Sequence, residues 1–405
     1  MNINEMNINM EIKKIAVIGA GAMGHGIGQV AAMAGFEVTL RDVSEEFVTG
    51  GMEKIRWSLN KLVEKKRITE EESKKTLDRI KPVVPLEEAV KDVDYVIEAA
   101  PENLNLKRQI FSEMDKLTPS HTILASNTSA ILITEIAEAT KRPEKVAGVH
   151  FFNPAQLMRL VEVVMGEKTS EETCNVSVEL VKKLGKEPVV CRKDVPGFIA
   201  NRITIPATNL IAWMVYKGEY TIEEVDAAAL QKAGMPMGIF ALLDYTGIDI
   251  AYNVIKFMEE REPLFEACPL IEEKIKKGEL GTKTGKGFYT YPEKGKWMMP
   301  DLDLTKAEKF DPMIQTYVTV NMAAELLRRK IATAEDIDKT IKLGFNFPIG
   351  ILELADTIGV DVVVSELNKI QEKYGEYYKP DPLLEEMTKK GELGSKTKKG
   401  FYTYT

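Results

Sequence analysis

The sequence predicts a doubly wound α/β domain followed by two similar all-helical domains. Short apolar runs alternate with helical patterns from about residue 13 to 150, as in a parallel sheet with helices on both faces. A glycine-rich turn follows the first apolar run. The segment GELGTKTGKGFYTY (278–291) recurs as GELGSKTKKGFYTY (391–404), which indicates a duplication of the helical part.

The composition restricts the class of protein. A length of 405 residues predicts two or three domains, and the net charge of −8 argues against a general nucleic-acid surface. No apolar run is long enough to span a membrane, so we expect neither nucleic acid nor membrane as a partner. Residues 1–11 lack the features of a secretory signal and read as a disordered tail, in which Met6 or Met10 could be the true start.

The cysteines and histidines show no metal-ligand spacing. Neither the cysteines (Cys174, Cys191, Cys268) nor the histidines (His25, His121, His150) form a spaced ligand motif. This pattern predicts free thiols in a reducing cytoplasm and no metal site.

The glycine-rich turn has the G-x-G-x-x-G spacing of a dinucleotide site. A strand pattern, Ile15–Ile18, precedes it, and a second one, Phe36–Leu40, ends at Asp42, 18 residues past the last glycine. The glycines would allow a tight turn, close approach of a pyrophosphate and close packing of helix on strand, and Asp42 would hold the ribose hydroxyls of NAD. The alternatives are a glycine-rich turn in another α/β protein and, because Arg41 adjoins Asp42, a preference for NADP. The expected cofactor loop comprises Gly19, Gly21, Ala22, Met23 and Gly24.

A long charged helical excursion, called here the helical arm (44–80), separates the second strand from the next. Its apolar residues recur at helical spacing, and Thr69 is expected to cap a second helix. The arm could be a solvated helical hairpin. It could equally lie over a substrate cleft, with Ser58 and Lys65 available to a nucleotide-like tail.

Polar residues follow several predicted strands. Asn127 and Ser129 follow the strand Thr122–Ala125, and His150 follows Val146–Val149. Ligands of doubly wound sheets bind beyond the carboxyl ends of the strands, so these side chains are candidates for the site. Glu102 and Lys107 begin the helix after Tyr95–Glu98, and Glu162 lies within the apolar run Leu160–Val164.

These side chains suit hydride transfer. Oxidation of an alcohol needs a base for the hydroxyl proton, which His150 could provide, and Glu162 could orient and stabilise its charged form. Neutral donors such as Ser129 and Asn201 could hold the substrate oxygen. The alternatives are a packed or capping histidine, a glutamate on an exposed strand face and an asparagine that caps a turn.

The helical half is divided by its repeat. A helix is expected to start at 194–197, to be kinked at Pro206 and to stop near Gly218. Five residues of the first copy recur at an offset of 112, so we predict a NAD-binding domain over 12–194, helical copy one over 195–293, a linker over 294–309 and copy two over 310–405. Copy two lacks the Pro-Gly-Phe-Ile-Ala-Asn-Arg segment and should form no second active site.

Together these motifs resemble the L-3-hydroxyacyl-CoA dehydrogenases, including the 3-hydroxybutyryl-CoA dehydrogenases and the dehydrogenase part of the fatty-oxidation multienzymes. The matching segments span nearly the whole chain in family order: AVIGAGAMGHGIGQVAAMAGFEVTLRD, VIEAAPENLNLKRQIF, ASNTSAIL, AGVHFFNPAQLMRLVEVV, DVPGFIANR and GxKTGKGFYTY. The resemblance implies a Rossmann domain followed by helical domains like the C-terminal domain of 6-phosphogluconate dehydrogenase. The second helical copy matches the multienzymes rather than the short members.

The resemblance also implies the roles of individual residues. His150 would be the base with Glu162 as its partner, and Ser129 and Asn201 would contact the substrate. Ser58 and Lys65 would meet coenzyme A. NAD would be surrounded by Asp42, Glu102, Lys107, Asn127 and Ser129.

The implied reaction is the reversible, NAD-dependent oxidation of an (S)-3-hydroxyacyl-CoA, with a short acyl chain such as 3-hydroxybutyryl, to the 3-oxoacyl-CoA. Copy two would pack on copy one as an internal pseudo-partner, in a monomer or a homodimer. Two rival readings stay open: a hydroxyacid or gulonate-type dehydrogenase, and a non-catalytic NAD-binding protein.

Overall fold

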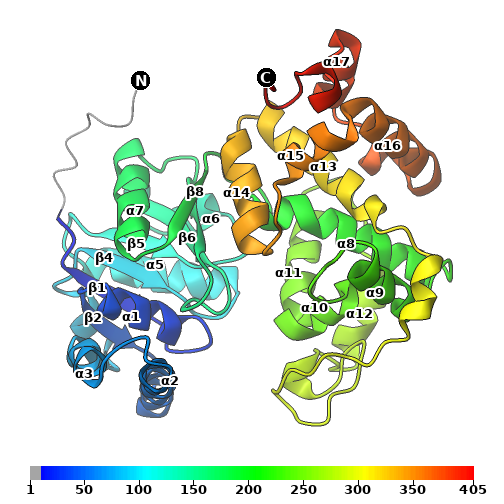
Figure 1. Cartoon of the computed structure of the whole chain (residues 1–405). Coiled ribbons are helices and arrows are strands. Elements are labelled where there is room, and N and C mark those ends of the chain that lie inside the picture. The colour runs from blue at the N-terminus through cyan, green and yellow to red at the C-terminus, as the bar shows by residue number, and fades with distance from the viewer. Residues whose placement is uncertain (1–10) are drawn as a thin grey trace. The chain divides into compact units, whose positions relative to one another are not determined.

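The computed structural model describes residues 11–405, and the chain divides into two compact units (Figure 1). The first unit ends at Phe198, and the second covers Ile199–Thr405. Nearly all of the predicted tail, residues 1–10, lies outside the described residues. Within residues 11–405, no helix combines the length and the apolar character needed to cross a membrane.

The first unit is built on one eight-stranded sheet with the order β3-β2-β1-β4-β5-β6-β7-β8. The first six strands pair in parallel, as predicted; β7 runs antiparallel to β6, and β8 is parallel to β7. The strands are β1 (Lys14–Ile18), β2 (Glu37–Arg41), β3 (Ile80–Val83), β4 (Tyr95–Glu98), β5 (Ile123–Ser126), β6 (Val146–Phe151), β7 (Leu160–Val164) and β8 (Glu187–Cys191).

The two edge strands were not predicted from the sequence. Each contains a proline, Pro82 in β3 and Pro188 in β8. Proline has no N–H to donate, so it weakens a strand pattern in the sequence while being tolerated at the edge of a sheet.

The helices of the first unit include the two helices expected in the helical arm. Thr69 caps the second of them in a capping box: Glu72 N donates to Thr69 Oγ1 at 3.1 Å, and Thr69 N donates to Glu72 Oε2 at 2.7 Å. The helices are α1 (Gly24–Met33), α2 (Glu45–Glu64), α3 (Glu70–Asp78), α4 (Leu86–Val90), α5 (Leu104–Leu117), α6 (Ile133–Ala137), the 3-10 turn η2 (Pro143–Lys145) and α7 (Glu171–Lys183).

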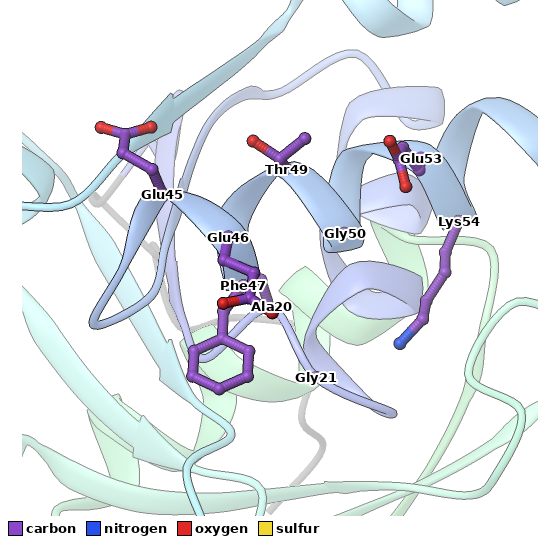
Figure 2. A pocket seen from close by; sticks show the side chains of 9 residues that line it. All are labelled: Ala20, Gly21, Glu45, Glu46, Phe47, Thr49, Gly50, Glu53 and Lys54. Atoms are coloured by element: carbon purple, nitrogen blue, oxygen red, sulfur yellow. The ribbon is translucent and has the colours of Figure 1, made fainter.

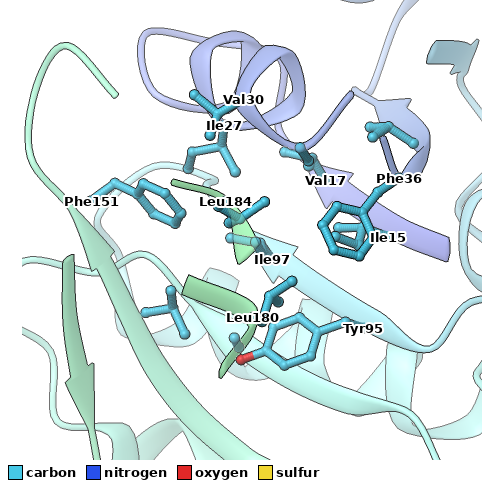
Figure 3. Packing of buried hydrophobic residues seen from close by; sticks show 14 of the residues in the cluster. Ile15, Val17, Ile27, Val30, Phe36, Tyr95, Ile97, Phe151, Leu180 and Leu184 are labelled. Carbon is cyan, nitrogen blue, oxygen red and sulfur yellow. The ribbon is translucent and has the colours of Figure 1, made fainter. Parts of the chain in front are cut away.

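Side chains along each strand alternate between the two faces of the sheet. Ile15, Val17, Tyr95 and Ile97 belong to the core that α1 and α7 cover, and Figure 3 shows this packing around Leu180 of α7. Because successive strand residues point to opposite faces, the residues between them face the other side. Glu98, Ser126, His150 and Glu162 are all in this second set, so one face of the sheet carries buried polar side chains.

The second unit consists of two runs of five helices in the same order. Helices α8 and α13 occupy corresponding places in the two runs and pack against each other. The first run comprises α8 (Ala200–Tyr216), α9 (Ile222–Gln231), α10 (Ile239–Thr246), α11 (Ile248–Glu259), α12 (Pro269–Lys276) and the 3-10 turn η3 (Thr282–Thr284). The second comprises α13 (Met313–Arg328), α14 (Ala334–Gly344), α15 (Ile351–Ile358), α16 (Val360–Tyr374), α17 (Pro382–Lys390) and the 3-10 turns η5 (Glu376–Tyr378) and η6 (Ser395–Thr397).

The expected start of the helix at 194–197 was wrong, because α8 begins at Ala200. Gly197 has a φ of 80° and Phe198 a φ of 55°, which no right-handed helix accommodates. The helix then continues through Pro206 to Tyr216 as a single element.

Buried carboxylates explain why the same residues recur in both runs. Asp244 accepts hydrogen bonds from Phe288 N, Tyr289 N and Tyr291 Oη, and Asp356 accepts the equivalent three from Phe401 N, Tyr402 N and Tyr404 Oη. A buried carboxylate is stable only when such donors surround it. The Gly-Phe-Tyr-Thr-Tyr segment therefore supplies donors to an aspartate on α10 or α15.

The segment predicted as a linker contains ordered structure. Residues Leu304–Glu308 form the 3-10 helix η4, which packs against α9. Phe310 is fully buried, with its ring centroid 5.1 Å from that of Tyr220. Apolar residues spaced without a period thus fix the connection between the two runs.

Candidate active site

The glycine-rich turn between β1 and α1 has the geometry that its motif predicts. Gly19 has a φ of 105°, and a side chain there would meet the Ala99 carbonyl oxygen at 2.6 Å. At Gly24 a Cβ would meet the Gly19 oxygen at 1.7 Å. At Gly21 nothing lies within 4 Å of that direction, so the backbone is open to a ligand there. A phosphate-bearing ligand therefore fits at the N-terminus of α1.

Asp42 lies directly beside this turn. Its Oδ2 accepts a hydrogen bond from Ala20 N at 2.7 Å, so the carboxylate is fixed next to the glycine motif. Arg41 is engaged elsewhere, because its Nε donates to Val84 O at 2.9 Å. The residue considered as a partner for a 2′-phosphate is thus directed toward the end of β3.

A cleft of about 570 Å³ lies between the glycine-rich turn and the first turns of α2 (Figure 2). Ala20 and Gly21 form one wall, and α2 forms the other with Glu45, Glu46, Phe47, Thr49, Gly50, Glu53 and Lys54. The cleft has three carboxylates and one ammonium group. It therefore disfavours a further anionic group beyond the phosphates that fit at the glycine-rich turn. For the lining residues on α2, the sequence offered no signal beyond their place in the helical arm.

Glu98, at the end of β4, is the centre of a buried polar network that the motifs did not predict. Lys107 Nζ, 1% exposed, donates to Glu98 Oε1 at 2.8 Å, and Ser126 Oγ donates to Glu98 Oε2 at 2.6 Å. Ala100 N also donates to Glu98 Oε1 at 2.6 Å. The predicted cofactor residue Lys107 therefore fixes the loop after β4 through Glu98.

Glu102, from the same loop, joins the ends of β4 and β5. Its Oε1 accepts hydrogen bonds from Ser129 N at 2.9 Å and Thr128 Oγ1 at 2.5 Å, and its Oε2 lies 3.5 Å from Lys107 Nζ. Asn127 Oδ1 accepts from Phe151 N at 2.8 Å. The structure thus brings Glu102, Lys107, Asn127 and Ser129 together at the carboxyl end of the sheet.

His150 and Glu162 form a buried pair. They stand directly opposite each other in the antiparallel register of β6 and β7, with His150 Nδ1 2.6 Å from Glu162 Oε2. Glu162 is fully buried and His150 is 7% exposed, so the exposed-strand alternative for Glu162 was wrong. His150 is the penultimate residue of β6 instead of following the strand. Its ring centroid lies 5.1 Å from Phe152 and 6.1 Å from Phe198.

The loop between these two residues has an anchor that the sequence did not indicate. Lys186, just before β8, is 8% exposed, and its Nζ donates to Ala155 O at 2.7 Å and Met158 O at 2.8 Å. Burial lowers the pKa of Lys186 to about 8. A lone lysine in a turn carries no motif, so only the fold reveals this contact.

The remaining predicted residues lie on other elements. Ser58 is half-buried on α2, and Lys65 is the exposed C-cap of that helix. Asn201 lies in the first turn of α8, in the second unit. His25, whose Nδ1 lies 2.6 Å from Gly21 O, is occupied within α1's first turn. Among residues 11–405, no cluster of His, Cys, Asp or Glu has the arrangement of a metal site.

Comparison with known proteins adds independent findings. Residues 14–195 match the family described as 3-hydroxyacyl-CoA dehydrogenase, NAD binding domain. Residues 197–291 and again 316–404 match the description 3-hydroxyacyl-CoA dehydrogenase, C-terminal domain. The second description therefore matches both runs of helices.

Individual relatives agree with this result. The chain is 44% identical to the probable 3-hydroxybutyryl-CoA dehydrogenase of Bacillus subtilis (strain 168), over 70% of this chain and 99% of that protein. It is 36% identical to the peroxisomal fatty acid beta-oxidation multifunctional protein MFP2 of Arabidopsis thaliana, over 95% of this chain and 56% of that protein. The crystal structure of 3-hydroxybutyryl-CoA dehydrogenase from Escherichia coli K12 superposes with a TM-score of 0.84 at 29% identity, covering 94% of this chain and all of that one.

Proposed function

The chain belongs to the 3-hydroxyacyl-CoA dehydrogenase family, and from that premise we propose that it oxidises (S)-3-hydroxyacyl-CoA thioesters to 3-oxoacyl-CoA reversibly with NAD. A short acyl chain is the favoured substrate class, because similar proteins from Bacillus subtilis and Escherichia coli are named 3-hydroxybutyryl-CoA dehydrogenases. The observation that carries the proposal is the buried pair of His150 and Glu162.

In this proposal His150 removes the hydroxyl proton of the substrate. With Glu162 accepting from Nδ1–H, the Nε2 atom is the basic nitrogen. Once Nε2 takes the proton, the imidazolium is stabilised by the Glu162 carboxylate at 2.6 Å. Phe152 and Phe198 pack beside the ring and limit the access of water to it. In the reverse direction the same nitrogen returns the proton to the carbonyl oxygen.

The glycine-rich turn and the carboxyl end of the sheet would hold the cofactor, which supplies the hydride acceptor when bound. Gly19, Gly21, Ala22, Met23 and Gly24 would face the pyrophosphate at the N-terminus of α1. Asp42 would bind the ribose hydroxyls and disfavour a 2′-phosphate. Glu102, Lys107, Asn127 and Ser129 would line the nicotinamide half.

The substrate would be held by neutral donors and by the helical arm. Ser129 and Asn201 would donate to the oxygen of the reacting carbon. Ser58 on α2 and Lys65, the C-cap of that helix, would contact the coenzyme A moiety, where an ammonium group suits a phosphate. A contact with coenzyme A would distinguish this substrate from the small hydroxyacids of the alternative, a hydroxyacid or gulonate-type dehydrogenase.

The experiment that tests the function is NADH consumption by the purified protein with acetoacetyl-CoA, with NADPH and free acetoacetate measured in parallel. We expect fast loss of NADH absorbance with the thioester, and slow loss with NADPH or with the free acid. Turnover of gulonate-type acids in place of acyl-CoA would establish the hydroxyacid dehydrogenase. Clear NADH binding without turnover of any of these, including longer acyl-CoAs, would establish the non-catalytic protein.

We also propose that residues 310–405, copy two, are an internal pseudo-partner of copy one (195–293) and form no second active site. The packing of α8 on α13 and the contact of Phe265 with Tyr377, at 5.0 Å between ring centroids, support this. A fragment 1–293 should aggregate or dimerise. A soluble, active, monomeric fragment would contradict the proposal.

We propose a cytoplasmic location because of the state of the cysteines. All three are free and buried, as a reducing compartment favours.

A further inference from the structure

A buried guanidinium adjoins Asn201 at the start of α8. The Arg202 side chain is 2% exposed. Its Nη1 donates to Glu262 Oε1 at 2.6 Å, and its Nη2 donates to Glu325 Oε1 and Oε2 at 2.9 and 2.8 Å. Glu262 follows α11 in copy one, whereas Glu325 lies on α13 in copy two. Carboxylates from both copies therefore bind one arginine.

Helix α8 begins without a side-chain cap. Its N-cap, Ile199, makes no side-chain capping hydrogen bond, and the two residues before it have positive φ angles. A cation in the first turn is also unfavourable with respect to the helix dipole, so Arg202 depends on its carboxylates. The ion pair between Arg202 and its two glutamates is thus a buried side-chain anchor of this turn.

Glu325 is held as a charged group. Burial by itself would raise its pKa, but the Arg202 charge and the hydrogen bonds from Arg202 and Arg329 hold the pKa below the ordinary value. Arg329 Nη1 donates to Glu325 Oε1 at 2.7 Å. At neutral pH Glu325 is therefore a carboxylate, and both of its oxygens accept hydrogen bonds from Arg202.

The duplication is asymmetric at this contact. At the offset of 112, Met313 and Ile314 stand where copy one has Asn201 and Arg202, and Trp213 stands where copy two has Glu325. Nearby positions kept their chemistry in both copies. Asn209 Oδ1 accepts from Cys268 N at 2.9 Å, and its counterpart, Asn321 Oδ1, accepts from Asp381 N at 2.7 Å. The carboxylate on copy two therefore binds an arginine that only copy one carries at this position.

We propose that Glu325 is a positioning residue through which copy two fixes the first turn of α8 and thereby aims Asn201 at the substrate. The inference rests on the proposed function, in which Asn201 contacts the acyl-CoA. Copy two then does more than pack on copy one as a pseudo-partner. It completes the support of a substrate-binding side chain on copy one. Glu262 alone binds only one end of the guanidinium, and a fork held at one end can rotate.

The test compares Glu325→Gln with a control that also breaks a contact between the copies. Glu219→Gln removes the copy-one carboxylate that binds Lys373 Nζ at 2.7 Å and Tyr374 Oη at 2.6 Å at the far end of α8. We expect Glu325→Gln to lower kcat/KM for acetoacetyl-CoA by tenfold or more with the KM for NADH unchanged, and Glu219→Gln to stay within twofold of wild type. Glu325→Asp keeps the charge and should recover part of the loss, and it replaces Glu325→Gln as the test if the latter does not fold.

A double variant separates positioning from general destabilisation. In an Asn201→Ala background, Glu325→Gln should cost less than threefold, because the side chain that it aims is gone. An undiminished tenfold loss in that background, or a loss in Glu325→Gln no larger than in Glu219→Gln, would overturn the positioning role. If Asn201→Ala itself keeps full turnover, the proposed substrate contact of Asn201 fails, and the positioning role falls with it. If the wild type turns over no acyl-CoA, the proposed function fails instead.

Discussion

Replacing Glu162 by glutamine probes the buried pair most sharply. The variant keeps the volume of the side chain and a carbonyl oxygen near His150 Nδ1, and it removes one negative charge from a fully buried position. In partly dry surroundings, two unit charges about 4 Å apart interact by about 4 kcal/mol. That stabilisation is present only when the imidazole is protonated during the reaction, so its loss should lower kcat roughly 10³-fold.

The assay is steady-state NADH oxidation with acetoacetyl-CoA, with NADH binding measured separately. Glu187→Gln is the matched control, because Glu187 is on β8, opposite Leu160 of β7, and its carboxylate forms an exposed ion pair with Arg159 at 3.0 Å. We expect this control to retain at least half of the wild-type kcat and both variants to bind NADH normally. A Glu162→Gln enzyme with kcat within threefold of wild type would show that the Glu162 charge does not stabilise the protonated imidazole during the reaction.

Three further predictions concern other residues of the first unit. Asp42→Asn should raise the KM for NADH about tenfold and leave the KM for acetoacetyl-CoA unchanged, since one ribose contact to a charged group contributes about 1.5 kcal/mol; equal changes in both constants would argue against a cofactor role. Lys186→Met should lower the free energy of unfolding, measured by denaturant titration, by about 2 kcal/mol, because the carbonyl oxygens after β6 lose a buried donor; a variant as stable as wild type would show that they are otherwise satisfied. Burial raises the pKa of Asp194 from 3.8 to about 6, so the folded chain takes up a proton at a higher pH than the unfolded chain does. The free energy of unfolding contributed by this group should therefore increase, by at most about 3 kcal/mol, as the pH falls from about 6 to 3.8. The free energy of unfolding of Asp194→Asn, measured by denaturant titration across that pH range, should lack this increase. An identical pH profile in both proteins would show that Asp194 titrates normally.

Two motifs with a stated mechanism gave structural predictions that were confirmed, whereas the proline motif at 194–197 did not. The glycine spacing gave the turn between β1 and α1, and the Thr69 capping box begins α3 where expected. The chemical requirement for a base led to His150 and Glu162 as partners, and the structure places them in contact. The catalytic and binding roles assigned to these residues stay predictions.

The rest depended on tertiary structure that local patterns do not encode. Prolines hid the edge strands, and the backbone of Phe198, with its φ of 55°, moved the start of α8. Glu98 and Lys107 are only nine residues apart, but their contact exists because a strand and the following helix fold back on each other. Lys186 contacts a loop about 30 residues earlier in the chain, which no spacing rule would reveal.

We propose His150 as the base of a 3-hydroxyacyl-CoA dehydrogenase. The most direct measurement is kcat with acetoacetyl-CoA for His150→Ala beside wild type, at saturating NADH and with NADH binding confirmed in both. We expect the variant to bind NADH like wild type and to lose at least 10³-fold in kcat. A variant that binds NADH and keeps kcat within tenfold would contradict this proposal and assign the proton to another group.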